Sequence, residues 1–375
     1  MNNYNIESTF IRKRGNNYNV YIEYINEEGK RKQKSLGKYD TKKEAEKHLV
    51  DLKSSINNNK FIISKDITFV DRYRKYHEDP SKNFSPLTIY KRESVVNVSI
   101  EPFFKDTKLQ DVTPYMLQTF INNIFAKYTK SAAQPIVGVV KAVLNEAYRL
   151  KEINENPCHF VKNPQSPKEG RESFEVYDKE EVKNIIDKLK GTNIEIPILL
   201  MLTMGLRTGE VCGLRWQDIN FKNNTISINQ ALIYVKGEIK FKQPKTKGSI
   251  RTISAPIELM TKLKKIKPLH NQYKLANMLE YEDLVCLNTK LNPFIPSVLR
   301  EAWKQFTFKN NIRYIRMHDL RHTHATFLVL SGTDFKTISN RLGHTDIQIT
   351  LNRYSHVLKE MDTNASDNIS DIMFK

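Results

Sequence analysis

A tyrosine near the carboxyl end of the chain lies ten residues after a histidine, in a region with helical periodicity. His344 belongs to the motif LGHTDIQ, and Tyr354 to the motif RYSH. Thr345 and Gln348 form a capping box, which predicts a helix that begins just after His344. Ile347 and Tyr354 then fall on one face of this helix, as core residues do. A phenol in that position can also act as a nucleophile if a base and cationic groups lie nearby.

Two arginines in separate motifs could supply such cationic groups. Arg207 lies in MGLRTGE, after an apolar run that predicts a helix. Gly205 is expected to end that helix in the left-handed conformation, and Thr208 to cap the next one. Arg207 would then lie in a tight turn beside a helix N-terminus, which favours anions. Arg321 lies in HDLRHTHAT, one helical turn after a histidine.

The histidines of this second motif are spaced in a way that also suggests a metal site. His318 and His322 are four residues apart, but no glutamate follows His318 as in a metalloprotease helix. We therefore expect no bound metal, and we interpret His322 and His324 as structural residues. No cofactor is expected either.

The composition indicates a polyanionic partner. The 375 residues include 60 Lys and Arg against 42 Asp and Glu, a formal net charge of +18. Nucleic acid is the first candidate, because no apolar run is long enough to span a membrane and no signal peptide is recognised. We expect a cytoplasmic protein. Cys158, Cys212 and Cys286 lack the spacing of a zinc site, so reduced cysteines are expected.

The elements that must position these residues form three regions, in a multidomain α+β chain. Residues 1–60 predict three strands, around 9–13, 19–25 and 31–36, and a helix that begins at the capping box of Thr41 and Glu44. Ten basic and four acidic residues between Arg12 and Lys43 alternate with tyrosines, which is typical of a sheet that contacts phosphates. A solvated charged hairpin is the alternative.

The remaining chain has helical periodicity at first and a mixed pattern later. Residues 66–162 predict a compact helical domain, with amphipathic stretches near 67–78, 86–98, 113–125 and 132–150. A linker rich in proline and polar residues follows at 163–170. Residues 173–375 predict a mostly helical domain with a small antiparallel sheet, whose strands lie near 225–229, 233–235, 239–241 and 250–253.

Taken together, the motifs LRTGE, HDLRHTHAT, LGH and RYSH, in this order and spacing, resemble those of the tyrosine recombinase family. The chain is similar to integrases of Gram-positive temperate phages and conjugative transposons. The resemblance covers nearly the whole length. Residues 1–60 resemble an arm-site DNA-binding domain, 66–162 a helical core-binding domain with a SAM-like fold, and 173–375 a catalytic domain with a C-terminal docking tail. The apolar residues of that tail are Ile369, Ile372, Met373 and Phe374.

The resemblance implies a role for each matching residue. Tyr354 would attack the scissile phosphate and form a 3′-phosphotyrosine, while Arg207 and Arg321 clamp the phosphoryl oxygens. His318 and His344 would assist proton transfer. A lysine in the turn between two strands would protonate the leaving 5′ oxygen, and we choose Lys245, with Lys247 as the alternative. Glu210 matches an acidic position of the family and is expected to orient Arg207 or His318.

The implied function is site-specific recombination that integrates and excises a mobile element, such as a viral genome. The implied partners are double-stranded DNA at attachment sites, three further copies of the chain in a tetramer, an excisionase and a host DNA-bending protein; no membrane partner is implied. Two alternatives are a type IB topoisomerase and a non-catalytic DNA-binding regulator. Outside the catalytic set, the residues expected to contact DNA are Arg12, Lys13, Arg14, Tyr18, Tyr21, Lys30, Arg31, Lys32, Lys34 and Lys247.

Overall fold

The computed structural model describes residues 5–26, 29–57, 61, 67–165, 174–243, 250–276, 281, 283–343 and 373. The chain divides into two compact units, residues 1–172 and residues 173–375. Within the first unit, the sheet and its helix have one hydrophobic core and the helical region has another. The observed class is the expected one, an α+β chain with a small N-terminal sheet, a helical region and a mostly helical C-terminal unit.

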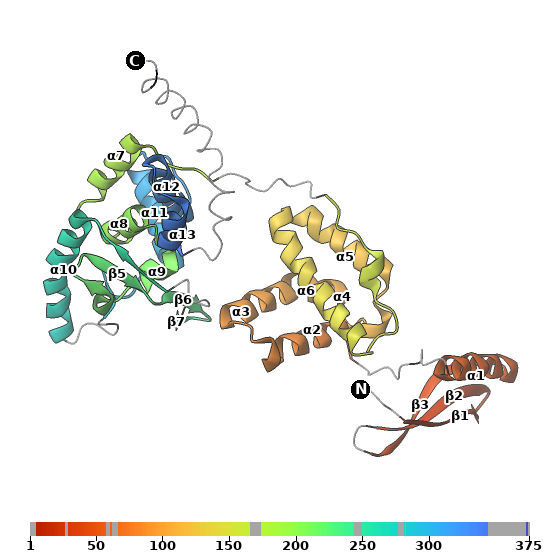
Figure 1. Cartoon of the computed structure of the whole chain (residues 1–375). Helices are drawn as coiled ribbons and strands as arrows, with labels where there is room; N and C mark the ends of the chain where they lie inside the picture. Colours follow the sequence, from red (N-terminus) through yellow and green to blue (C-terminus); the bar gives the residue numbers. More distant parts are fainter. Residues whose placement is uncertain are drawn as a thin grey trace. The chain divides into compact units, whose positions relative to one another are not determined.

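The N-terminal sheet contains three antiparallel strands in the order β1-β2-β3. The strands are β1 (Asn5–Arg14), β2 (Asn17–Ile25) and β3 (Arg31–Tyr39), and α1 (Lys42–Asn57) follows them. The predicted capping box begins α1, because the Thr41 hydroxyl accepts from the Glu44 amide and the Glu44 carboxylate accepts from the Thr41 amide. Helix α1 covers one face of the sheet, where Val20 and Ile22 are fully buried (Figure 1).

Each of the four predicted amphipathic stretches of the helical region forms a helix that begins close to the expected residue, and one short helix, Glu101–Phe104, was not predicted. The main helices of this region are α2 (Phe69–Glu78), α3 (Pro86–Val95), α4 (Glu101–Phe104), α5 (Pro114–Lys127) and α6 (Lys130–Arg149). Thr68, Ser85 and Thr113 cap α2, α3 and α5 through their side-chain oxygens. A π-helical turn, Val96–Ile100, joins α3 to α4, and short 3-10 turns lie at Pro80–Lys82, Leu109–Asp111 and Pro157–Phe160.

The second unit contains two small antiparallel sheets surrounded by helices. Its helices are α7 (Lys179–Leu189), α8 (Glu195–Met204), α9 (Thr208–Cys212), α10 (Ile257–Leu275), α11 (Pro296–Lys309), α12 (Met317–Leu330) and α13 (Phe335–Leu342). Its strands are β4 (Ile219–Asn220), β5 (Thr225–Ile228), β6 (Ala231–Val235), β7 (Glu238–Lys242) and β8 (Arg251–Ser254). They pair as β4-β5-β8 and as β6-β7, close to the predicted ranges.

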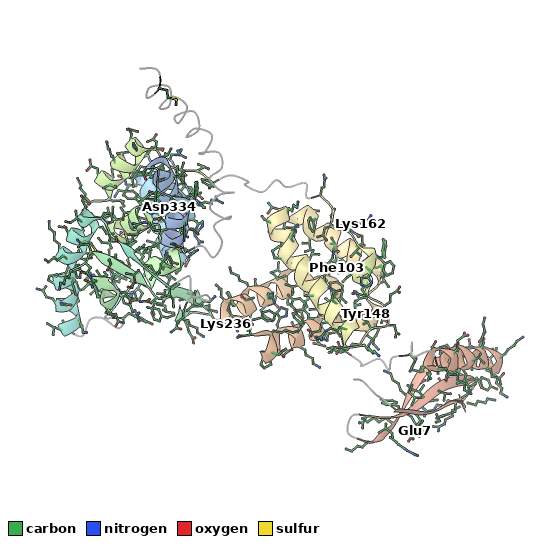
Figure 2. All side chains as sticks on the ribbon, in the orientation of Figure 1. Glu7, Phe103, Tyr148, Lys162, Lys236 and Asp334 are labelled. Atoms are coloured by element: carbon green, nitrogen blue, oxygen red, sulfur yellow. The ribbon has the colours of Figure 1, made fainter. Side chains whose placement is uncertain are left out.

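The core of the second unit forms around α8, whose residues are nearly all apolar and buried. A helix that is apolar on all sides must be surrounded, and α8 packs against α7, α9, α10 and α12. Helix α12 in turn packs against α13, whose N-cap is Asp334, labelled in Figure 2. The Asp334 carboxylate accepts from the Thr337 amide. This stack of α8, α12 and α13 places the two arginine motifs beside each other. Among the described residues, every helix is too short or too polar to cross a bilayer.

Candidate active site

Arg207 lies in the predicted tight turn between α8 and α9. Gly205 ends α8 with a left-handed φ of 66°, and a Cβ there would lie 2.6 Å from Cδ2 of His324. The N-cap of α9 is Arg207 itself, so the prediction that Thr208 caps this helix is wrong. The Glu210 carboxylate takes over the cap: its Oε2 accepts from the Arg207 amide at 2.9 Å, and its Oε1 accepts from Nη1 of Arg207 at 2.9 Å.

Arg321 projects from α12 into the interior and is only 2% exposed. Its Nη1 donates to the Gly205 carbonyl oxygen at 2.7 Å, and its Nη2 donates to the Leu342 carbonyl oxygen at 2.5 Å. Arg321 therefore joins the end of α8 to the end of α13. These two bonds use two of its five N–H groups and hold the guanidinium in one orientation.

Glu210 is shared by two arginines. Arg251, the first residue of β8, donates from Nη2 to Oε2 of Glu210 at 2.9 Å and from Nη1 to Oε1 at 3.2 Å. Burial raises the pKa of Glu210, but the hydrogen bonds and charge of Arg251, together with Arg207, outweigh burial and hold the pKa at about 2. Glu210 is therefore a carboxylate at neutral pH and acts as an acceptor, in agreement with its expected orienting role.

At the carboxyl end of α13, three consecutive carbonyl oxygens each accept a hydrogen bond from a different arginine. Arg251 donates from Nε to the carbonyl of Arg341 at 2.8 Å, Arg321 to that of Leu342, and Arg207 from Nη2 to that of Gly343 at 3.3 Å. Carbonyls at a helix C-terminus have no partner within the helix and carry partial negative charge, so they attract guanidinium groups. Arg207 and Arg321 therefore lie together at the point where the chain continues to His344.

The three histidines of α12 have different surroundings. His318 is exposed and packs edge-on against His322, with ring centroids 5.0 Å apart. His322 is buried and stacks on Phe174. His324 is buried, and its Nδ1 donates to the Leu202 carbonyl, because its Nε2 accepts from Arg341. Burial and the charge of Arg341 lower the pKa of His324 to about 3, so this ring is neutral.

Of the six predicted catalytic residues and the alternative lysine, Lys247, four fall outside the described residues. These are Lys245, Lys247, His344 and Tyr354, and the expected capping box at Thr345 and Gln348 lies there too. Of the predicted catalytic set, the structure therefore places Arg207, His318 and Arg321. Gly343, the residue before His344, packs closely against Arg251, since a Cβ on Gly343 would lie 2.9 Å from Nη1 of Arg251.

The predicted DNA-contacting residues of the N-terminal sheet lie on both of its faces. Alternation along the strands puts Arg12, Arg14 and Tyr21 on the face opposite α1, where both guanidinium groups lie over the Tyr21 ring. Arg31, opposite Ile25, is on this open face too and pairs with Glu7. The residues on the α1 side are Lys13, Tyr18, Lys32 and Lys34. Lys13 pairs with Tyr18, Lys34 with Ile22 and Lys32 with Tyr24, which all face α1. Lys30 lies just before β3.

Sequence reasoning missed Arg251 and Arg341 as parts of the site. Arg251 was not singled out from the sequence, yet it is buried, with only 9% of its surface exposed. One signal could have revealed it: in β8 the buried positions alternate, and Arg251 has the same parity as the apolar Ile253. A basic residue on the buried side of a strand requires an acidic partner, here Glu210.

Comparisons with known proteins match each of the three regions of the chain. Three family models match successive parts of the chain: an Arm DNA-binding domain over residues 10–56, a phage integrase N-terminal SAM-like domain over 68–125, and the phage integrase family over 175–361. A tyrosine recombinase XerC-like protein of Caldanaerobacter subterraneus subsp. tengcongensis is 30% identical, over 88% of this chain and 90% of its own length. The ICEBs1 integrase of Bacillus subtilis is 22% identical over 89% and 91%.

Solved structures show the same fold. The integrase of transposon Tn1549, solved with a circular intermediate DNA, superimposes with a TM-score of 0.67 at 19% identity, covering 79% of this chain and 99% of that one. The lambda integrase in a dimer bound to a core site gives a TM-score of 0.58 at 16% identity, covering 92% and 94%. The chain belongs to the phage integrase family of tyrosine recombinases. It is a tyrosine-type site-specific DNA recombinase, as its motifs indicated.

Proposed function

We propose that the chain integrates and excises a mobile element by transesterification, with Tyr354 as the nucleophile. The phenolic oxygen forms a bond to the scissile phosphorus, and the bond to the 5′ oxygen breaks. The product is a 3′-phosphotyrosine and a free 5′-hydroxyl, so a second 5′-hydroxyl can reverse the step without an external energy source. A cofactor is not required for this chemistry.

Arg207 and Arg321 are the proposed clamp for the non-bridging oxygens of the phosphate. The observation that carries this proposal is their convergence on the adjacent carbonyls of Leu342 and Gly343, one residue before the segment that contains His344 and Tyr354. Guanidinium groups held in advance at one place stabilise the negative charge that develops in the transition state. Arg207 is the more accessible of the two, with 38% of its side chain exposed.

The proton transfers are assigned to residues around this clamp. The phenol of a tyrosine has a pKa of about 10, so Tyr354 must lose its proton to a base, for which we propose His318 with His344. The departing 5′ oxygen must gain a proton, for which we propose Lys245, with Lys247 as the alternative. His318 is exposed at the start of α12, where it can reach a bound substrate.

Binding of duplex DNA at attachment sites is proposed for all three regions. Residues 1–60 would bind arm sites, 66–162 the core site, and 173–375 the scissile phosphate. The positive net charge and the guanidinium groups over Tyr21 on the open face of the N-terminal sheet support this division. The residues proposed to contact DNA include Arg12, Arg14 and Arg31 there, and Lys247 beside the catalytic site.

Assembly as a homotetramer on DNA is also proposed, with the C-terminal tail docking on a neighbouring copy. A related fold has been solved as a lambda integrase tetramer bound to a Holliday junction, with a TM-score of 0.57 at 16% identity. An excisionase and a host DNA-bending protein would set the direction of recombination. The protein would act in the bacterial cytoplasm, on the nucleoid when bound.

The nucleophile is tested with a nicked suicide substrate that carries the core site read from the junctions of the integrated element. The cut fragment diffuses away, so the covalent protein–DNA adduct accumulates and is measured on a denaturing gel. Tyr354→Phe should form no adduct, because phenylalanine has no oxygen to attack the phosphate. The control is Tyr314→Phe, at a half-exposed tyrosine of the same unit, which should form the adduct at the wild-type rate. An adduct with Tyr354→Phe would contradict the assignment.

A further inference from the structure

Arg251 holds three parts of the second unit together without being able to reach a substrate itself. Its side chain is 6% exposed, and it lies at the start of β8, four residues after the candidate Lys247 in the sequence. Its guanidinium makes a two-pronged bond to Glu210 and a further bond from Nε to the carbonyl of Arg341. A buried side chain with this bonding pattern acts by fixing its neighbours.

The orientation of Arg207 depends on Arg251 through Glu210. Each carboxylate oxygen of Glu210 accepts from both arginines: Oε1 from the two Nη1 atoms, at 2.9 and 3.2 Å, and Oε2 from the Arg207 amide and Nη2 of Arg251, both at 2.9 Å. The two-pronged bond determines the plane of the carboxylate, and that plane determines where the half-exposed Arg207 guanidinium points.

The carboxyl end of α13 depends on the same residue. Nε of Arg251 bonds to the Arg341 carbonyl, and Gly343 packs against the Arg251 guanidinium with no room for a side chain. The carbonyls of Leu342 and Gly343, which bond to the two clamp arginines, follow directly in the chain. Without Arg251 in place, the Arg207–Glu210 pair could move relative to the carbonyl oxygens at the end of α13.

We infer that Arg251 is a positioning residue for strand cleavage, which aligns the Arg207–Glu210 pair with the carboxyl end of α13 so that Arg207 meets the transition state. This inference rests on the proposed function. Lysine is a poor replacement, because a single ammonium cannot bond to both oxygens of Glu210 and to the Arg341 carbonyl in the same plane.

The test compares Arg251→Lys with wild type on two suicide substrates, in single-turnover reactions at saturating DNA with the full-length chain. One substrate has the natural phosphodiester, and the other has a methylphosphonate at the scissile position, in which a methyl group replaces one charged oxygen. On the phosphodiester, Arg251→Lys should form the adduct at least about tenfold more slowly than wild type. On the methylphosphonate the defect should shrink to about twofold, because less negative charge develops for Arg207 to stabilise.

This comparison separates positioning from a loss of folded protein. Both substrates are tested with the same preparation, so the fraction of folded protein cancels in the ratio of the two defects. The matched control is Arg215→Lys, which alters a similar two-pronged arginine–carboxylate pair, with Asp218, in the same unit. Its rates on both substrates should equal those of wild type. Equal defects of Arg251→Lys on the two substrates would overturn the inference.

A second variant covers the case in which Arg251→Lys does not fold. Glu210→Gln keeps the size of the side chain but breaks the shared carboxylate, and it should show the same larger defect on the phosphodiester. Equal rate defects of Glu210→Gln on the phosphodiester and the methylphosphonate would also overturn the inference. The proposed function fails separately: if Tyr354→Phe forms the adduct, the nucleophile is wrong, whereas wild-type cleavage by Arg251→Lys refutes only the positioning role.

Discussion

At the scale of single residues, His324 shows how a neutral side chain limits stability at low pH. Its pKa in the fold is about 3, because burial and Arg341 oppose protonation, against an ordinary value of 6.5. As the pH falls below 6.5, the unfolded chain takes up a proton that the folded chain refuses. The contribution of the neutral His324 to the unfolding free energy is therefore fully present above about pH 6.5. It decreases by about 1.4 kcal/mol per pH unit between pH 6.5 and pH 3.

The corresponding prediction concerns His324→Asn, whose amide can still donate to the Leu202 carbonyl but does not titrate. Between pH 7.5 and pH 5, wild type should lose about 2 kcal/mol more unfolding free energy than the variant. Urea unfolding followed by tryptophan fluorescence measures this, since both tryptophans, Trp216 and Trp303, lie in the second unit. The control is His318→Asn, at an exposed histidine of the same helix. An unchanged pH dependence in His324→Asn would contradict the prediction.

At the scale of elements, the end of α13 depends on a glycine for two separate reasons. Gly343 has a left-handed φ of 66°, and the Arg251 guanidinium fills the space where a Cβ would be. Gly332, which follows α12, has a similar φ of 76° but open space around it. Comparing alanine substitutions at Gly332 and Gly343 therefore separates the cost of backbone strain from the cost of crowding Arg251.

We predict that Gly332→Ala lowers the unfolding free energy by about 1 kcal/mol, from backbone strain alone. Gly343→Ala should lower it by about 1–3 kcal/mol more, because the new methyl group displaces Arg251 from Glu210. Urea unfolding by tryptophan fluorescence gives both values. Similar losses in the two variants would mean that Arg251 moves aside without cost.

At the scale of the whole molecule, we expect the positive charge to bind DNA through particular surfaces, such as the open face of the N-terminal sheet. The N-terminal sheet has one face covered by α1 and an open face with Arg12 and Arg14 over Tyr21. We predict that Arg12→Gln with Arg14→Gln lowers the slope of log K against log salt by about 2 for duplex DNA with the arm sites, since each lost phosphate contact removes about 0.9.

The matched control removes the same charge from the other side of the sheet. Lys32→Gln with Lys34→Gln should change the salt slope by less than half as much, because these residues share the face of α1. Fluorescence anisotropy of full-length protein over a range of salt concentrations measures both slopes. Equal changes for the two pairs would mean that net charge, and not the open face, determines binding.

The sequence by itself determined the features that depend on neighbouring residues. The capping box of α1, the left-handed Gly205, the strand ranges and the three-part order of the chain were predicted, because caps and alternation involve residues within a few positions. The motifs that contain Arg207, His318 and Arg321 were recognised for the same reason. Even the local prediction for α9 was wrong in one detail, since Arg207, and not Thr208, is the N-cap, and the Glu210 carboxylate accepts from the Arg207 amide.

Only the tertiary structure decided how distant residues meet. Arg251 reaches Glu210 across 41 positions, and Arg207 reaches the Gly343 carbonyl across 136. The first contact joins β8 to α9, and the second joins the turn before α9 to the end of α13. Such packing depends on many side chains at once, so no local pattern specifies it. The motifs of the two proposed clamp arginines could thus be recognised in the sequence, whereas their hydrogen bonds to the last carbonyls of α13, and the contact of Arg251 with Glu210, follow from the fold.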